Sequence, residues 1–188
     1  GNVALLGELD RRCVLALGFG ASRGAAASLA VAALAQPFEQ TWMEYIEAWR
    51  SWHTECHARA TVASVAPKVD RQLALSRMVL RCHLDKTHPG AMVASLSVPW
   101  GNAKDDRGGY HLVWPRDLVE CASALLAVGG EREARDVLRY LIATQYVDGH
   151  WNQNQWLGGT PFWQGVQLDE AALPVLLAAL LAENDALD

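Results

Sequence analysis

Apolar residues recur at helical spacing along most of this 188-residue chain, which predicts a mainly helical protein. The most regular stripe runs over residues 131–144, where apolar positions follow the i, i+3, i+4, i+7, i+8 rule. Residues 168–181 are apolar almost all round, which predicts a buried helix. Four further segments also carry helical patterns: residues 22–35, 41–59, 69–84 and 118–128.

Other patterns place a strand before the helices and long loops between them. Val14 to Leu17 is a short apolar run closed by Gly18 and Gly20, which predicts a β-strand. A Gly-Gly pair at 129–130 separates two predicted helices and indicates an antiparallel helical hairpin. Long polar and aromatic loops alternate with the helices, so we expect their residues to gather at one end of a helical array.

The composition is that of an ordinary globular protein. Hydrophobic residues make up 51% and charged residues 20%, which suits one domain or parts of two. The net charge of −5 gives nucleic-acid binding no electrostatic support. No stretch approaches the ~20 uninterrupted apolar residues of a membrane span, so we expect no membrane partner. Because the chain starts with Gly-Asn-Val and shows no signal peptide, its localisation stays open.

The cysteines and histidines form no motif for metal or redox chemistry. Because the cysteines are irregularly spaced without a CxxC, we expect reduced, buried thiols at Cys13, Cys56, Cys82 and Cys121, with two long-range disulfides as the alternative. His53 and His57 are spaced i, i+4, but their HTECH sequence matches neither HExxH nor HxxEH. We expect a solvated helix face there, and no metal or organic cofactor.

The strongest chemical signal is the sequence GGYHLVWPRD at residues 108–117. Arg116 and Asp117 can hold hydroxyl groups through charge-assisted hydrogen bonds, while Tyr110 and Trp114 can cover the apolar face of a sugar ring. A second aromatic cluster follows and consists of Trp151, Trp156, Phe162 and Trp163. Together these residues predict a carbohydrate site.

Structural roles are the alternative for several of these residues. Asp117 and Glu120 fit an acidic capping box, so Asp117 is also a candidate helix cap. The tryptophans are also candidates for the core. Asp169 and Glu170 open the last predicted helix, where the helix dipole favours acids, although Glu170 is also a minor candidate for a catalytic acid.

Longer segments resemble a known family. They are SLSVPWGN (95–102), GGYHLVWPRDLVE (108–120), DGHW (148–151) and GTPFWQGVQLDEAALPVLLA (159–178). In combination they resemble the bacterial branch of glycoside hydrolase family 15, the glucoamylase and glucodextranase family. The resemblance implies an incomplete (α/α)6 barrel. It places the end of an N-terminal β-sandwich at residues 1–20, a helical linker at 21–66 and the first part of the barrel at 67–188.

The resemblance also implies roles for the loop residues. Family members release glucose from the non-reducing ends of α-glucans and invert the anomeric centre. Arg116 and Asp117 match the pair that holds the hydroxyls of the terminal sugar. Tyr110 matches the aromatic residue that faces its ring, and Trp163 one that lines the cleavage point. The expected substrate-binding set is Tyr110, Trp114, Arg116, Asp117, Trp156 and Trp163.

The catalytic residues of the family are expected beyond Asp188, the last residue of this sequence. Inversion needs a general acid and a general base about 6.5–9.5 Å apart. In the family the acid lies in a Trp-Glu-Glu stretch and the base lies further towards the end of the barrel. Because this sequence has no such stretch up to Asp188, we expect the chain alone to be inactive.

The resemblance leaves the exact ligand open. The expected partners are an α-glucan or oligosaccharide and the remainder of the barrel. The linkage (α-1,4, α-1,6 or trehalose) is not determined by these residues, and a non-catalytic carbohydrate-binding helical module is the alternative.

Overall fold

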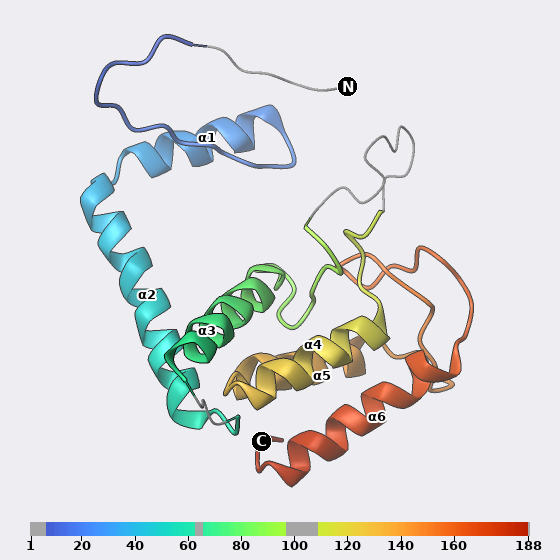
Figure 1. Ribbon diagram of the computed structural model, residues 1–188. Coiled ribbons are helices and arrows are strands. Elements are labelled where there is room, and N and C mark those ends of the chain that lie inside the picture. Colours follow the sequence, from blue (N-terminus) through green and yellow to red (C-terminus); the bar gives the residue numbers. More distant parts are fainter. Residues whose placement is uncertain (1–6, 63–65, 97–108, 188) are drawn as a thin grey trace. The chain divides into compact units, whose positions relative to one another are not determined.

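Every helix predicted from the sequence is present. A computed structural model describes residues 7–62, 66–96 and 109–187, to which the structural statements below refer. The helices of this part are α1 (Arg23–Leu34), α2 (Phe38–Arg59), α3 (Pro67–Cys82), α4 (Pro115–Ala127), α5 (Glu131–Thr144) and α6 (Leu168–Glu183) (Figure 1). Their ends lie within about three residues of the predicted ones.

The chain forms two compact units, residues 1–52 and 53–188. In the first unit, Ser22 caps α1, because its side-chain oxygen accepts the N–H of Ala25 at 3.2 Å. Along the part of α2 that belongs to this unit, the rings of Phe38, Trp42 and Tyr45 follow one another with centroids 6.4 and 6.1 Å apart. These spacings of three and four residues are the helical pattern seen in the sequence.

The strand predicted near the start of the chain is not formed in the described part of the chain. Residues 13–20 pair with no other described segment, and Leu15, Leu17 and Phe19 are exposed. A strand needs a neighbouring strand for its backbone hydrogen bonds, whereas Gly18 here lies directly against the backbone of Ala26 in α1. The backbone at Gly18 therefore packs against α1, and the apolar side chains of this run stay exposed.

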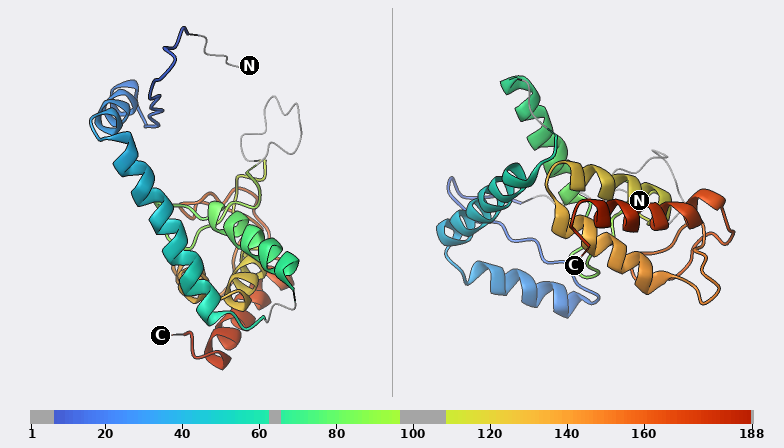
Figure 2. Two further views of the ribbon diagram at one scale, coloured as in Figure 1. Left: turned by 60° about the vertical axis from the view of Figure 1, so that its left-hand side comes forward. Right: turned by 90° about the horizontal axis from the view of Figure 1, so that it is seen from below.

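The core of the second unit lies between α4, α5 and α6, which run side by side (Figure 2). The fully buried leucines of this core are Leu118, Leu125, Leu141, Leu177 and Leu181. Burying each such side chain contributes about 2 kcal/mol relative to leaving it exposed. The amphipathic stripe of α5 is thus buried against α4 and α6, as its pattern predicts, except at Ile142, which is exposed.

The predicted hairpin joins α4 to α5. Gly129 has φ +87°, and a Cβ there would collide with the backbone oxygen of Cys56. Only glycine adopts this conformation without strain while allowing such a close approach. Gly129 and Gly130 therefore end α4 and let α5 begin at Glu131.

The prediction that residues 168–181 form a helix buried almost all round is only half right. Leu177 and Leu181 of α6 are fully buried, but Leu168, Val175 and Leu176 are exposed. The reason is that α4 and α5 cover one face of α6 and no described segment covers the other. No described helix is both long and apolar enough to cross a membrane.

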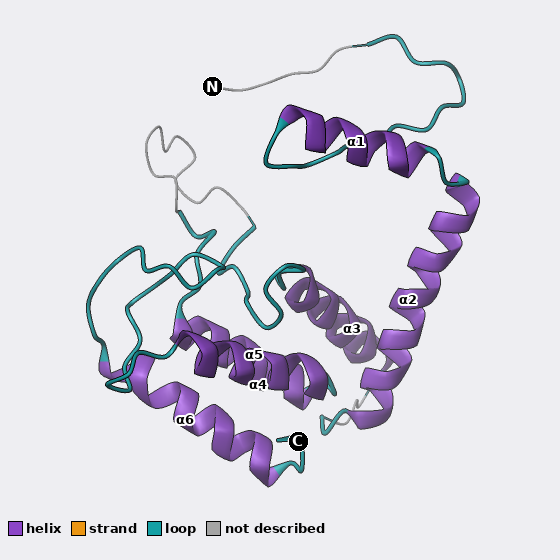
Figure 3. Ribbon diagram, turned by 180° about the vertical axis from the view of Figure 1, so that it is seen from behind, coloured by secondary structure: helices purple, strands orange, loops and turns teal. Residues whose placement is uncertain are grey.

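The loops of the second unit gather at one end of its helices, as predicted (Figure 3). Val113, just before α4, exchanges two backbone hydrogen bonds with Gln155, with N–O distances of 2.8 and 3.0 Å. Ala94 donates its N–H to Leu112 O at 3.0 Å. Backbone hydrogen bonds therefore connect the segment before α4 with the segment before α6 and with residue 94.

Candidate functional site

The sequence GGYHLVWPRD at residues 108–117 leads into α4, which begins at Pro115, three residues before the predicted start. Pro115 is the first helical residue and Trp114 is the N-cap, without a side-chain cap hydrogen bond. Proline suits this position because it fixes φ and has no N–H that needs an acceptor. The capping box predicted for Asp117 is therefore wrong, and Asp117 instead lies within the first turn, next to Arg116.

A cavity of about 430 Å³ lies beside this first turn. It is lined by Ala94, Tyr110, Trp114, Arg116, Asp117 and Trp163. The structure thus brings together five of the six residues expected to bind substrate. The sixth, Trp156, lies outside this lining, and its ring packs edge-on against Phe162 at a centroid distance of 5.5 Å.

The three aromatic residues of the cavity form one connected wall. The ring of Trp114 lies 5.7 Å from that of Tyr110 and 6.1 Å from that of Trp163, the latter edge to face at 80°. Trp114 is buried, whereas Tyr110 and Trp163 are 38% and 44% exposed. Trp114 therefore belongs to the core and also supports the two rings that are accessible to a ligand.

Buried amide side chains hold the loop that carries Trp163, and sequence reasoning missed them. Asn154 is fully buried, and its Oδ1 accepts the N–H of Trp163 at 2.8 Å. Gln155 is also buried, and its Nε2 donates to the hydroxyl of Tyr140 at 3.0 Å. The signal in the sequence is the run WNQNQW, in which amides between tryptophans indicate a loop with its own polar core.

Three carboxylates surround the guanidinium of Arg116. Its Nη1 lies 2.8 Å from Asp169 Oδ2 and 3.7 Å from Glu170 Oε1, and its Nη2 lies 3.4 Å from Asp117 Oδ2. The hydrogen bond to Asp169 raises the pKa of Arg116 and lowers the pKa of the Asp169 carboxyl. The site therefore holds a fixed cation within an excess of negative charge.

Glu170 lies beneath this group and away from the cavity lining. Its side chain is fully buried, and its Oε2 accepts the backbone N–H of Arg116 at 2.6 Å. Burial raises the pKa of Glu170 to about 7, and its contacts with the N–H and the charge of Arg116 act against that rise. This placement gives the carboxyl group no access to a ligand in the cavity.

The expected position of the catalytic acid and base, beyond Asp188, falls outside the described residues. The described part of the chain ends at residue 187, so the position of the catalytic acid and base stays a prediction. Within the described part, the cavity presents the carboxylate of Asp117, and the minor catalytic candidate Glu170 is buried away from it. Among the described residues, Asp117 is therefore the one carboxylate in the lining of this cavity.

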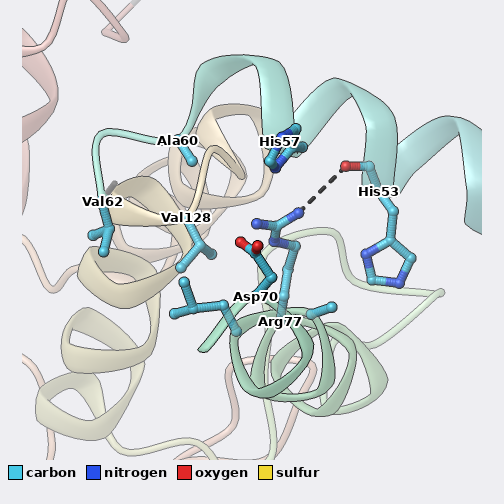
Figure 4. A pocket seen from close by; sticks show the side chains of 9 residues that line it. His53, His57, Ala60, Val62, Asp70, Arg77 and Val128 are labelled. Carbon is cyan, nitrogen blue, oxygen red and sulfur yellow. Dashed lines mark hydrogen bonds between the residues drawn. The ribbon is translucent and has the colours of Figure 1, made fainter. Parts of the chain in front are cut away.

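A second cavity, of about 400 Å³, lies beside α3 and the end of α2 (Figure 4). It is lined in part by His53, His57 and Asp70, and by Arg77, which is buried and donates from Nη1 to His53 O at 3.3 Å. His57 is exposed, in agreement with the predicted solvated face, while His53 is half-buried, and burial lowers its pKa. No group of His, Cys, Asp or Glu among the described residues is arranged to hold a metal ion.

The cysteines match their prediction only in part. Cys13, Cys56, Cys82 and Cys121 are all free thiols, as expected. Cys56 alone is buried, and burial raises the pKa of its thiol to about 11. The expectation of four buried thiols is wrong because Cys13 precedes the helices and Cys82 ends α3 at an exposed position.

Comparison with known proteins agrees with the resemblance that the sequence motifs carry. Residues 1–54 match the family model of glucodextranase, domain N, and residues 69–148 match that of glycosyl hydrolases family 15. The whole chain is 34% identical to a glucoamylase of Clostridium sp. (strain G0005), of which it covers 27%.

The structure is also similar to a solved one. It matches the crystal structure of a bacterial glucoamylase complexed with acarbose with a TM-score of 0.74 and 36% sequence identity, over 89% of this chain and 24% of that one. The chain thus spans about a quarter of the length of the relatives that it matches. The predicted fold class is confirmed as mainly helical, with part of an (α/α)6 barrel. The chain is therefore similar to the N-terminal part of a glucoamylase-like member of glycoside hydrolase family 15.

Proposed function

We propose that the cavity beside Arg116 binds the terminal glucose of an α-glucan, as part of an exo-acting, inverting hydrolase that releases glucose. The observation that carries this proposal is the convergence of Tyr110, Arg116, Asp117 and Trp163 on one cavity of about 430 Å³. That volume lies within the range of about 300–1,000 Å³ usual for small-molecule pockets. The similarity to a glucoamylase complexed with acarbose, an oligosaccharide analogue, supports the same class of ligand.

The lining suits a sugar because it combines polar and apolar groups. Asp117 and Arg116 both line the cavity, and the buried Asp117 Oδ2 lies 3.4 Å from Arg116 Nη2. One sugar hydroxyl can donate to the other oxygen of this carboxylate while a neighbouring hydroxyl accepts from the guanidinium. The accessible rings of Tyr110 and Trp163 can cover the C–H faces of the pyranose. Recognition of this kind depends on geometry and needs no metal or organic cofactor.

The cavity supplies binding groups rather than the catalytic pair. Inversion needs two carboxyl groups about 6.5–9.5 Å apart, one to protonate the leaving oxygen and one to activate water. Among the described residues that line the cavity, Asp117 is the one carboxylate, and Arg116 lies against it. We assign Asp117 to binding and place the general acid and base on segments of the longer enzyme beyond Asp188.

The proposed division of the chain follows from the same resemblance. Residues 1–20 would end the N-terminal domain, residues 21–66 would link it to the barrel, and residues 67–188 would begin the barrel. The exposed apolar face of α6, with Leu168, Val175 and Leu176, would then pack against further barrel helices. An apolar face of this kind favours a partner that removes it from water.

Tryptophan fluorescence during titration tests the proposed binding site. Acarbose, maltotetraose and isomaltotetraose are added in turn to the chain, and Arg116→Ala and Asp117→Asn should each weaken the binding about tenfold or more. Asp136→Asn is the matched control because Asp136 lies on α5 and pairs with Arg139 outside the cavity. Equal affinities in all four proteins would refute the assignment of the cavity.

A further inference from the structure

We propose that Glu170 is a positioning residue of the sugar cavity, because it anchors the start of α4 from the first turn of α6 and holds Arg116 at the cavity edge. The inference rests on the proposed function, since Arg116 contacts a sugar only if the cavity binds one. Glu170 would act through Arg116 and would touch neither the sugar nor the reacting atoms.

The first link between Glu170 and Arg116 is a backbone hydrogen bond. Arg116 is the second residue of α4, a position at which the N–H has no acceptor within its own helix. No side chain at the N-cap position, Trp114, accepts a hydrogen bond from this turn. The Arg116 N–H donates to Glu170 Oε2 at 2.6 Å instead, so a residue 54 positions later in the sequence acts as the cap.

The second link fixes the guanidinium of Arg116. Nη1 faces α6, where it lies 2.8 Å from Asp169 Oδ2 and 3.7 Å from Glu170 Oε1. Nη2 lies 3.4 Å from Asp117 Oδ2, and both Arg116 and Asp117 are among the residues that line the cavity. With one edge held by α6, the side chain loses little further conformational freedom when a sugar binds, which favours affinity.

Packing alone does not explain a carboxylate at position 170. Glu170 is the one acidic side chain that is buried among the described residues, and burying a carboxylate costs free energy unless it is compensated. An apolar residue of similar volume would fill the same space without that cost. The contacts of the Glu170 carboxylate with the N–H and the guanidinium of Arg116 therefore indicate that its role is to place this arginine.

The test combines a signal from Arg116 with sugar affinity, both measured on the whole chain. The backbone amide of Arg116 is followed by ¹⁵N NMR, and acarbose binding is followed by tryptophan fluorescence. Glu170→Ala and Glu170→Leu should both shift the Arg116 amide signal and weaken acarbose binding about tenfold. Glu170→Gln keeps an acceptor oxygen and should restore both. Glu183→Ala, at the exposed end of α6, is the control and should change neither.

The outcomes separate this inference from the proposed function. Should Glu170→Ala fail to fold, Glu170→Leu carries the test, because it keeps the core filled. An unchanged Arg116 signal and unchanged affinity in a folded Glu170→Leu variant would overturn the inference. A wild-type chain that binds no acarbose would instead contradict the proposed function. The Arg116 signal would then still decide whether Glu170 anchors this residue, by shifting or staying unchanged in the Leu variant.

Discussion

At the scale of single residues, Arg116 organises the site. Its backbone N–H is bound by Glu170, and its guanidinium contacts Asp117, Asp169 and Glu170. The sequence allowed Arg116 and Asp117 to be predicted as neighbours in a sugar motif. The sequence could not reveal that Glu170 caps α4, because an acceptor on a distant helix leaves no pattern near the start of α4. Asp117 and Glu120 do match a local pattern, the capping box, but they do not form one.

The buried carboxyl of Glu170 should make stability depend on pH. Its pKa rises from 4.5 to about 7 on burial, so the folded chain binds more protons than the unfolded chain between these values. The stabilisation from protonated Glu170 is fully present below about pH 4.5 and is lost as the pH rises to about 7, by roughly 3 kcal/mol in total. Urea unfolding across this range should show the loss in the wild-type chain.

Glu170→Gln provides the comparison for this pH dependence, since glutamine does not titrate. The difference in unfolding free energy between the wild-type chain and this variant should change with pH in the stated direction. Parallel pH profiles for the two proteins would show that Glu170 keeps an ordinary pKa when it is buried.

At the scale of elements, periodicity predicted the helices and glycine predicted the α4–α5 hairpin. The pattern of residues 131–144 gave both ends of α5 because one face of that helix is buried against α4 and α6. The loop at residues 151–165 was predicted as a loop, but its internal order was not. That order comes from the side-chain amides of Asn154 and Gln155, whose partners depend on the folded path of the chain.

Gly129→Ala should destabilise the hairpin between α4 and α5. At φ +87° an alanine is strained, and its Cβ would meet the Cys56 backbone oxygen, so we expect a loss of about 2 kcal/mol or more. Gly24→Ala is the control, because Gly24 lies within α1 with open space around its Cβ position. Thermal unfolding should give a lower Tm for Gly129→Ala and an unchanged or higher one for Gly24→Ala. Equal Tm values for Gly129→Ala and the wild type would contradict the proposed constraint.

At the scale of the whole molecule, the second of the two units has a helical core in which one face of α6 is covered by no described segment. Residues 13–20 were expected to form a strand, yet a strand depends on a partner that no described segment supplies. The exposed face of α6 departs from the buried helix that its apolar pattern predicts, but it agrees with the resemblance, since part of a barrel leaves the flank of its last helix uncovered. Family similarity thus predicted the helical architecture, whereas the strand that both the resemblance and the apolar pattern at Val14 to Leu17 predicted is not formed in the described residues.

The open face of α6 should make the chain associate with itself. Val175 and Leu176 are 66% and 60% exposed and lie next to each other on this helix, so contact between two copies would remove both from water. Light scattering after size-exclusion chromatography should show association that Leu176→Lys reduces. Leu75→Lys, a change of another exposed leucine on α3, should leave the association intact. A monomeric wild-type chain at high concentration would argue against this prediction.

The central claim is that this chain carries a sugar-binding cavity without the pair of carboxyl groups that cleaves the sugar. The most direct test is NMR of the anomeric protons of maltotetraose incubated with the chain. We predict broadening of the oligosaccharide signals by the wild-type chain, less broadening by Asp117→Asn, and no release of β-glucose. Release of β-glucose would show that both catalytic carboxyl groups lie within these 188 residues, and unbroadened signals would show that the cavity does not bind the sugar.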